Sequence, residues 1–189
     1  MKKKIILLTL LLVCSDFCIA NELNDRINVL YAENNINEAL SLLFSIPEEE
    51  RTSQNWLLMG NILQDQDKND DAEFMYNSAI AADEKNYKAH YNLGLIYLKQ
   101  NKPNSAIAEF KKSVKYKSDF AYGYYNLGCA YLQINKLNNA KWEFFKAIDI
   151  NNQVPDFYYN LAYTYKKLKN EKQAKIYLDY YNKLIERGN

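Results

Sequence analysis

The chain has few of the residues that make tight turns or catalytic centres. Its 189 residues include 5 glycines and 3 prolines, so little of it can be turn-rich β structure or flexible linker. His90 is the single histidine, which leaves no second histidine for a metal cluster or a proton relay. Neither a glycine-rich phosphate loop nor an HExxH motif occurs. We therefore expect no catalytic residues, no metal and no cofactor.

Cysteine is also scarce. Of the 3 cysteines, only Cys129 lies beyond residue 20. A single cysteine cannot form an internal disulfide, so this part of the chain must be held together by packing. We predict that Cys129 is a small, half-buried apolar residue, with a reactive or intermolecular thiol as the alternative.

Neither sign of charge dominates, since the formal net charge is +1. The charges are nevertheless unevenly placed: residues 21–86 hold 14 acidic and 4 basic residues, whereas residues 87–189 hold 8 acidic and 17 basic residues. This distribution predicts a dipole that would steer an oppositely polarised partner or favour head-to-tail contact between copies. The alternative is a solvated surface without a selected role. The acidic half argues against nucleic acid as a partner.

The only long apolar run lies at the N-terminus. Residues 2–4 are lysines, residues 5–13 are apolar, and Cys18-Ile19-Ala20 offers small residues for cleavage. This order predicts a secretory signal peptide over residues 1–20, and hence a periplasmic or secreted protein. A membrane-spanning helix would need about 20 apolar residues, and Asp16 interrupts the run. An uncleaved anchor is the alternative, and no membrane span is expected in the mature chain.

Lipid attachment is a weaker prediction for the same segment. Cys14 and Cys18 both lie near the end of the apolar run. The residue before a lipidated cysteine is normally small, whereas these cysteines follow Val13 and Phe17.

A pattern that recurs every 34 residues covers most of the remaining chain. Each unit combines a large ring, a Leu or Met followed by a small residue, and a Leu or Tyr: Trp56-x2-Met59-Gly60-x2-Leu63, His90-x2-Leu93-Gly94-x2-Tyr97, Tyr124-x2-Leu127-Gly128-x2-Tyr131 and Tyr158-x2-Leu161-Ala162-x2-Tyr165. An alanine and a larger residue four positions later complete each unit: Ala72 and Tyr76, Ala106 and Phe110, Ala140 and Phe144, Ala174 and Leu178. Four units therefore share one register.

The pattern resembles the tetratricopeptide repeat (TPR) over roughly residues 53–188. The proline that usually ends the unit is replaced by Glu84, Ser118 and Asn152. The resemblance implies an all-α fold, an α-solenoid in which antiparallel helix pairs stack into a right-handed superhelix. The four units are 53–86, 87–120, 121–154 and 155–188. Residues 21–52 repeat the two-helix spacing without the aromatic or the glycine, so we predict a degenerate first repeat that caps the stack.

Several repeated residues are expected to pack rather than to react. Gly60, Gly94 and Gly128 lie mid-helix at one register, where a small residue lets the paired helix approach closely. His90 occupies the column of Trp56 and Tyr124, so we predict an interhelical packing role for it.

By resemblance, the first helices of successive repeats line a concave groove. The groove positions include an asparagine column and a tyrosine column, and further Lys and Tyr residues lie beside them: Asn92, Asn126, Asn160, Tyr91, Tyr125, Tyr159, Lys88, Lys99, Tyr122, Tyr163 and Lys166. A side-chain amide can both donate to and accept from an extended peptide backbone. We predict that these residues bind a peptide; the alternative is that they only belong to the repeat consensus. The lysine and asparagine positions needed for a C-terminal carboxylate clamp are not filled.

The predicted function is a non-enzymatic protein-interaction module of the bacterial cell envelope, with a protein or peptide as its partner. The last helix carries an apolar side, formed by Ile176, Tyr177, Tyr180 and Leu184, that is expected to be partly exposed. This side and the charge dipole make self-association, a homo-oligomer, the alternative. An enzymatic function would need a site that the sequence does not offer.

Overall fold

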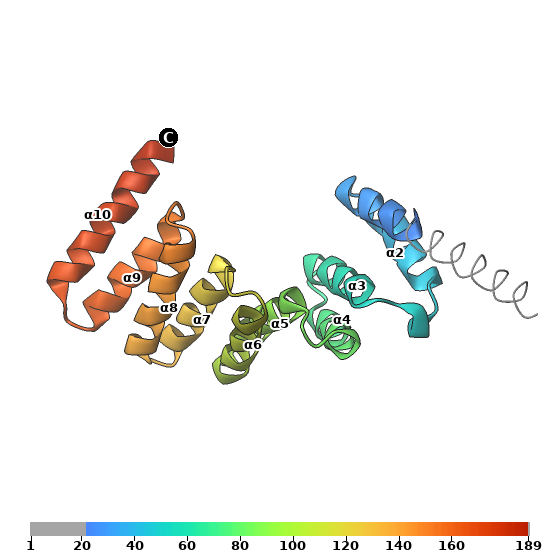
Figure 1. Ribbon diagram of the computed structural model, residues 1–189, viewed down its shortest axis with the longest axis horizontal. Coiled ribbons are helices and arrows are strands. Elements are labelled where there is room, and N and C mark those ends of the chain that lie inside the picture. The colour runs from blue at the N-terminus through green and yellow to red at the C-terminus, as the bar shows by residue number, and fades with distance from the viewer. Residues whose placement is uncertain (1–21, 189) are drawn as a thin grey trace, which may run out of the picture.

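The computed structural model describes residues 22–188, and this part of the chain is helical throughout, without strands. A helix over 22–32 is followed by α2 Ile36–Ser45 and a short 3-10 helix, Glu48–Glu50. Four helix pairs follow: α3 Ser53–Asp65 with α4 Asn69–Ala82, α5 Tyr87–Lys99 with α6 Pro103–Tyr116, α7 Ala121–Gln133 with α8 Leu137–Ile150, and α9 Pro155–Lys167 with α10 Glu171–Gly188. The predicted α-solenoid is confirmed. Figure 1 shows the pairs along an arc, with α3 and α5 toward its inner side and α4 and α6 outside.

Each pair is closed by the same turn. A residue with positive φ occurs at Asn34, Asp67, Asn101, Asn135 and Lys169, and the last four of these positions are 34 residues apart. In each case the following residue donates its backbone N–H to a carbonyl five positions earlier, as from Lys102 to Tyr97 at 2.7 Å. Asn and Asp tolerate this left-handed conformation better than other side chains do, so Lys169 is the unusual member.

The helix over 22–32 and α2 form a fifth pair with the same turn, since Asn35 donates to the carbonyl of Leu30 at 2.8 Å. Ile27 and Leu43 are buried and join the core around Trp56 and Leu57. The outer surface of this pair is charged, and Arg26 on it forms an exposed ion pair with Glu38.

The mid-helix glycines touch the partner helix of their own repeat. A methyl group on Gly94 would lie 2.6 Å from Cε1 of Phe110. Methyl groups on Gly60 and Gly128 would lie 2.5 and 2.6 Å from Cε1 of Tyr76 and Phe144, respectively. These rings are fully buried. In the last repeat Ala162 replaces the glycine and Leu178 replaces the ring, so the extra methyl group faces a smaller neighbour.

His90 is fully buried between helices, which confirms its predicted packing role. Its Nε2 lies 2.9 Å from the carbonyl oxygen of Glu84, and its Nδ1 lies 2.7 Å from Oε2 of Glu109. The ring also stacks on Tyr116. Both ring nitrogens therefore meet acceptors, an arrangement that the other repeats lack because Trp56, Tyr124 or Tyr158 occupies this column.

Candidate functional site

The three asparagines of the predicted groove, Asn92, Asn126 and Asn160, form a row along α5, α7 and α9 that we call the asparagine row. Each side chain is half-buried and donates Nδ2–H to a side chain of the preceding repeat. Asn92 donates to Oδ1 of Asn61 at 2.8 Å, Asn126 to the hydroxyl of Tyr91 at 3.0 Å, and Asn160 to the hydroxyl of Tyr125 at 2.7 Å. The asparagine row therefore links consecutive repeats, which sequence reasoning missed. The spacing of 35 residues between each Tyr and its Asn was the available signal.

The same contacts leave polar atoms available. The Nδ2 of Asn126 also donates to the backbone oxygen of Tyr122 at 3.1 Å, which orients the amide. Among the described residues, no hydrogen bond uses the Oδ1 atoms of the asparagine row. Because Tyr91 and Tyr125 accept from the asparagines, their own hydroxyl protons can be donated to another group, which for Tyr125 includes the neighbouring thiol of Cys129. The repeats 87–120 and 121–154 thus each combine a hydroxyl donor with an amide acceptor.

Neighbouring aromatic rings hold these tyrosines. Phe120 packs edge-on against Tyr91 with ring centroids 4.9 Å apart, and Phe157 lies 4.9 Å from Tyr125. Burial raises the pKa of Tyr91 and, to a greater extent, that of Tyr125. Both hydroxyls therefore stay protonated, and able to donate, over the whole physiological pH range.

Cys129 lies half-buried beside this row and packs into the core, as predicted. Burial raises the pKa of its thiol to about 11. Nδ2 of Asn160 lies 3.8 Å from its Sγ. Since the thiolate is the reactive form, a thiol with this pKa is a poor nucleophile at neutral pH.

The predicted lysines have different surroundings. Lys99 reaches back to the turn of the preceding repeat, where its ammonium group binds the carboxylate of Asp67 and lies 3.4 Å from Oδ1 of Asn69. One repeat later, Gln133 donates to Oδ1 of Asn101 at 2.8 Å in the same way. Lys99 therefore joins repeats, whereas Lys88 is exposed at the start of α5.

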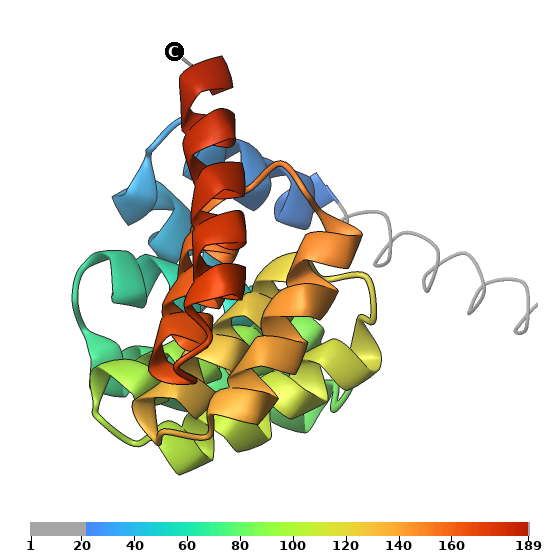
Figure 2. The same ribbon diagram turned by 90° about the vertical axis from the view of Figure 1, so that its left-hand side faces the viewer.

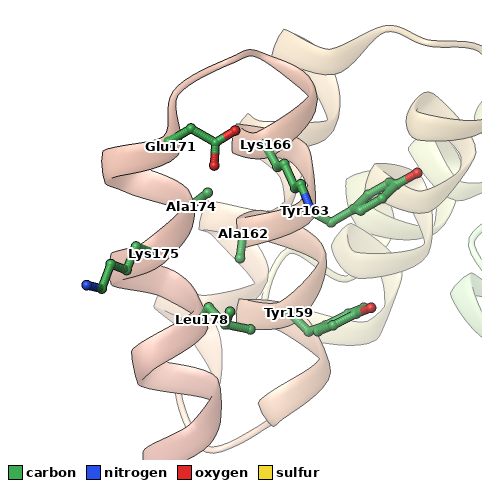
Figure 3. Close-up of a pocket in the computed structure, with 8 residues that line it drawn as sticks. All are labelled: Tyr159, Ala162, Tyr163, Lys166, Glu171, Ala174, Lys175 and Leu178. Atoms are coloured by element: carbon green, nitrogen blue, oxygen red, sulfur yellow. The ribbon is translucent and has the colours of Figure 1, made fainter.

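The remaining predicted residues lie toward the C-terminal end. Tyr122 is 47% exposed and packs edge-on against Phe157. Tyr159, Tyr163 and Lys166 line a pocket of about 370 Å³ between α9 and α10, which we call the end face. Figure 3 shows Tyr159 and Tyr163 extending from α9 to the same side, with Leu178 and Lys175 on α10. The end face consists of eight residues: Tyr159, Ala162, Tyr163, Lys166, Glu171, Ala174, Lys175 and Leu178.

The apolar side of α10 is partly covered. Tyr177 stacks on Tyr165 with ring centroids 5.5 Å apart, and Tyr180 stacks on Tyr158 at 5.7 Å. Tyr177 and Leu184 are half-buried, whereas Ile176 and Tyr180 are exposed. Figure 2 shows α10, in red, in front of the other helices, with its C-terminal end extending beyond them.

Residues 22–188 offer neither a metal site nor a membrane span. They contain no group of three His, Cys, Asp or Glu side chains that could hold a metal ion. None of the helices in this range combines the length and the hydropathy needed to cross a membrane. Residues 1–20, for which a signal peptide is predicted, lie outside the described residues.

Family models decide the classification. Models of the tetratricopeptide repeat match residues 57–121, 121–154 and 155–187. The chain is a tetratricopeptide repeat protein. The repeats that the sequence pattern predicted are thereby confirmed. TPR proteins are generally non-enzymatic modules that bind proteins or peptides, and the fold of this chain supports a protein-interaction scaffold.

Solved TPR structures share the fold. A structure of MamA is 17% identical over 86% of this chain and 95% of its own, with a TM-score of 0.78. MamA residues 41–end from Desulfovibrio magneticus RS-1 are 20% identical over 90% of this chain and 96% of their own, also with a TM-score of 0.78. YrrB, described as a TPR protein with an unusual peptide-binding site, is 21% identical over 84% of this chain and 82% of its own, with a TM-score of 0.73. No curated protein sequence matches the chain.

Proposed function

We propose that this TPR protein is a non-enzymatic scaffold that holds an extended peptide segment of a partner protein along the asparagine row. The observation that carries the proposal is the repeated pair of unused groups. Each asparagine presents an Oδ1 acceptor, and Tyr91 and Tyr125 present hydroxyl donors. An extended backbone alternates N–H and C=O groups, so it can pair with such a series whatever its side chains are.

The row is also fixed before a ligand arrives. The contacts from Asn126 to Tyr91 and Tyr122, and from Asn160 to Tyr125, hold the amides in place. A ligand therefore loses little free energy to the ordering of the groove. The peptide-binding site named for YrrB supports a peptide as the ligand, as does the general use of TPR modules.

Changing Asn126→Ala together with Asn160→Ala is expected to reduce partner capture at least tenfold while the protein stays helical. The double variant removes two of the unused acceptors and two links between repeats. Protein comprising residues 21–189 would be immobilised and incubated with cell-envelope extract. The captured proteins would be quantified by mass spectrometry. Circular dichroism would check helicity.

The matched control is Asn104→Ala with Asn138→Ala. These asparagines are exposed at the start of α6 and α8, away from the asparagine row. The control should capture partners as the unaltered protein does. Equal capture by the unaltered protein and by both double variants would reject the groove as the binding site.

We further infer that the protein is exported to the bacterial cell envelope, on the strength of the lysines at 2–4 and the apolar run at 5–13. The intact mass of the protein from the periplasmic fraction should correspond to a chain that begins near Asn21. A mass beginning at Cys18 with added acyl chains would indicate a lipoprotein instead. A full-length mass in the cytoplasmic fraction would contradict export.

A further inference from the structure

The end face is the part of the last repeat that the other repeats keep covered. Six of its residues are exposed: Tyr159, Tyr163, Lys166, Glu171, Lys175 and Leu178. At the same six positions in the three preceding repeats, every residue is buried or half-buried. Leu178 is 41% exposed, whereas Tyr76, Phe110 and Phe144 in its column are 0% exposed. Within the described residues, nothing covers this surface.

The preceding repeats show what covers such a face. In each case it is the first helix of the next repeat, as α9 covers the face of α7 and α8. Four residues of α9 that contact it are Phe157, Asn160, Leu161 and Thr164, at spacings of three, one and three residues. Phe157 packs on Tyr125, Asn160 donates to its hydroxyl, and Leu161 joins the cluster around Phe144. The end face is therefore shaped to receive an amphipathic helix.

The chain's own first helix does not have this pattern. The first helix can be compared with α9 by aligning the turn residue Asn34 with the turn residue Lys169. The four contact positions of α9 then correspond to Glu22, Asp25, Arg26 and Val29. Arg26 would replace Leu161, a fully buried residue, and would have to leave its ion pair with Glu38 to lie against Leu178. Burying an unpaired guanidinium is costly. A second copy stacked in the register of the repeats is therefore disfavoured as the occupant.

Charge defines the occupant further. Inside the solenoid, the end of α5 meets acceptors on the preceding repeat: Lys99 binds Asp67, and Gln100 donates to Oε2 of Glu73 at 2.9 Å. At the end face, the columns of Asp67 and Glu73 contain Lys169 and Lys175, and Lys166 lies nearby. A helix that binds there meets the ammonium groups of Lys166, Lys169 and Lys175 at its last turn, with Glu171 as the one carboxylate among them. Carboxylates on the bound helix would pair with these ammonium groups.

We propose that the end face binds an amphipathic helix of another protein, which bears an apolar stripe in the α9 pattern and carboxylates in its last turn. This interaction would extend the solenoid by one helix, at a surface distinct from the asparagine row. The partner would contribute the helix that each internal repeat receives from its neighbour.

A peptide with the sequence of α9 tests the proposal directly. The probe is a peptide of residues 154–168 with Lys167→Glu and Leu168→Glu, labelled with a fluorophore. Its helix is stabilised by a cross-link on the side that faces solvent, because isolated short helices are only marginally stable. Fluorescence anisotropy would measure its binding to the protein of residues 21–189. The probe is expected to bind saturably to the unaltered protein. Its affinity should be at least tenfold lower for the protein with Lys169→Glu and Lys175→Glu. A probe with Leu161→Asp should also bind the unaltered protein at least tenfold more weakly.

Two controls separate this site from the others. The Asn126→Ala, Asn160→Ala protein should bind the probe as the unaltered protein does, so a failure of the groove proposal leaves this one standing. Sedimentation of the protein alone should show a monomer. The proposal is overturned by absent saturable binding, by binding that ignores the lysine variant, or by a dimer that Lys175→Glu dissociates, since a second copy would then be the occupant.

Discussion

Replacing Gly94 with Ala is expected to lower the free energy of unfolding by about 1–3 kcal/mol, the usual cost of overpacking a core. This change in stability is opposite in sign to that expected in an exposed helix, where Ala is favoured over Gly by about 1 kcal/mol. The reason is steric: the new methyl group would lie 2.6 and 2.8 Å from two carbons of the Phe110 ring. That ring is fully buried, so it cannot move away from the new methyl group into solvent. Urea denaturation followed by circular dichroism would measure the change.

The last repeat supplies the compensating change. Ala162 is tolerated opposite Leu178, so Gly94→Ala should be partly rescued by Phe110→Leu. The double variant should therefore be more stable than the sum of the two single changes predicts, because the methyl group occupies space that the smaller side chain vacates. If the two changes in unfolding free energy simply add, steric contact between these residues is not the reason for the glycine.

Replacing Glu109 with Gln is expected to destabilise the protein by about 1–3 kcal/mol at pH 7, the range for hydrogen bonds to charged groups. Burial alone would raise the pKa of the Glu109 carboxyl, but hydrogen bonds from His90 and Lys112 outweigh burial and hold the pKa below its ordinary value. The carboxylate lies 2.7 Å from Nδ1 of His90 and 2.9 Å from Nζ of Lys112. Its loss leaves the buried ring without a charged partner.

The effect should depend on pH in a defined direction. Because the pKa of Glu109 is lower in the folded than in the unfolded state, its contribution is present above the unfolded value of about 4.3. The contribution disappears as the pH falls through the folded pKa. The difference between the variant and the unaltered protein should therefore shrink on going from pH 7 to below pH 4, as measured by denaturation at each pH.

Glu143→Gln is the matched control. Glu143 occupies the same position one repeat later, is 14% exposed against 13% for Glu109, and also pairs with a lysine three residues on, Lys146. It differs in that Tyr124 occupies the column of His90 in its repeat. Its replacement should cost less than about 1 kcal/mol, the usual range for a lysine pair at the surface. Equal losses for the two variants would show that His90 adds nothing.

Most of the fold was predictable because one unit is repeated. Four segments share one register, so the same helix contact occurs in several repeats. Gly94 and Phe110 can therefore be identified as a contact pair by comparison with Gly60 and Tyr76. The turn with positive φ at Lys169 was not predictable from its residue type. Only its position in the repeat indicates the left-handed conformation.

The site was less predictable, since a column of identical residues does not show which atoms are already in use. The sequence places Asn126 and Asn160 on one face of the first helices, but their bonds to Tyr91 and Tyr125 depend on how adjacent repeats are rotated. The pairing of Lys99, a predicted groove residue, with Asp67 of the preceding repeat was not expected from the sequence. The end face was not predicted as a site, because its residues occupy the same columns as covered residues of the internal repeats. Its exposure follows from its place in the stack.

The contacts between helices also determine how the chain can reach its structure. Each helix packs mainly against helices one or two places away in the sequence, from α3 with α4 to α9 with α10. Contacts between nearby segments cost little loop-closure entropy, and a stack of this kind can begin to fold at any repeat. The packing of a helix pair therefore does not require a segment that is distant in the sequence. It can pack while the rest of the polypeptide is still being synthesised.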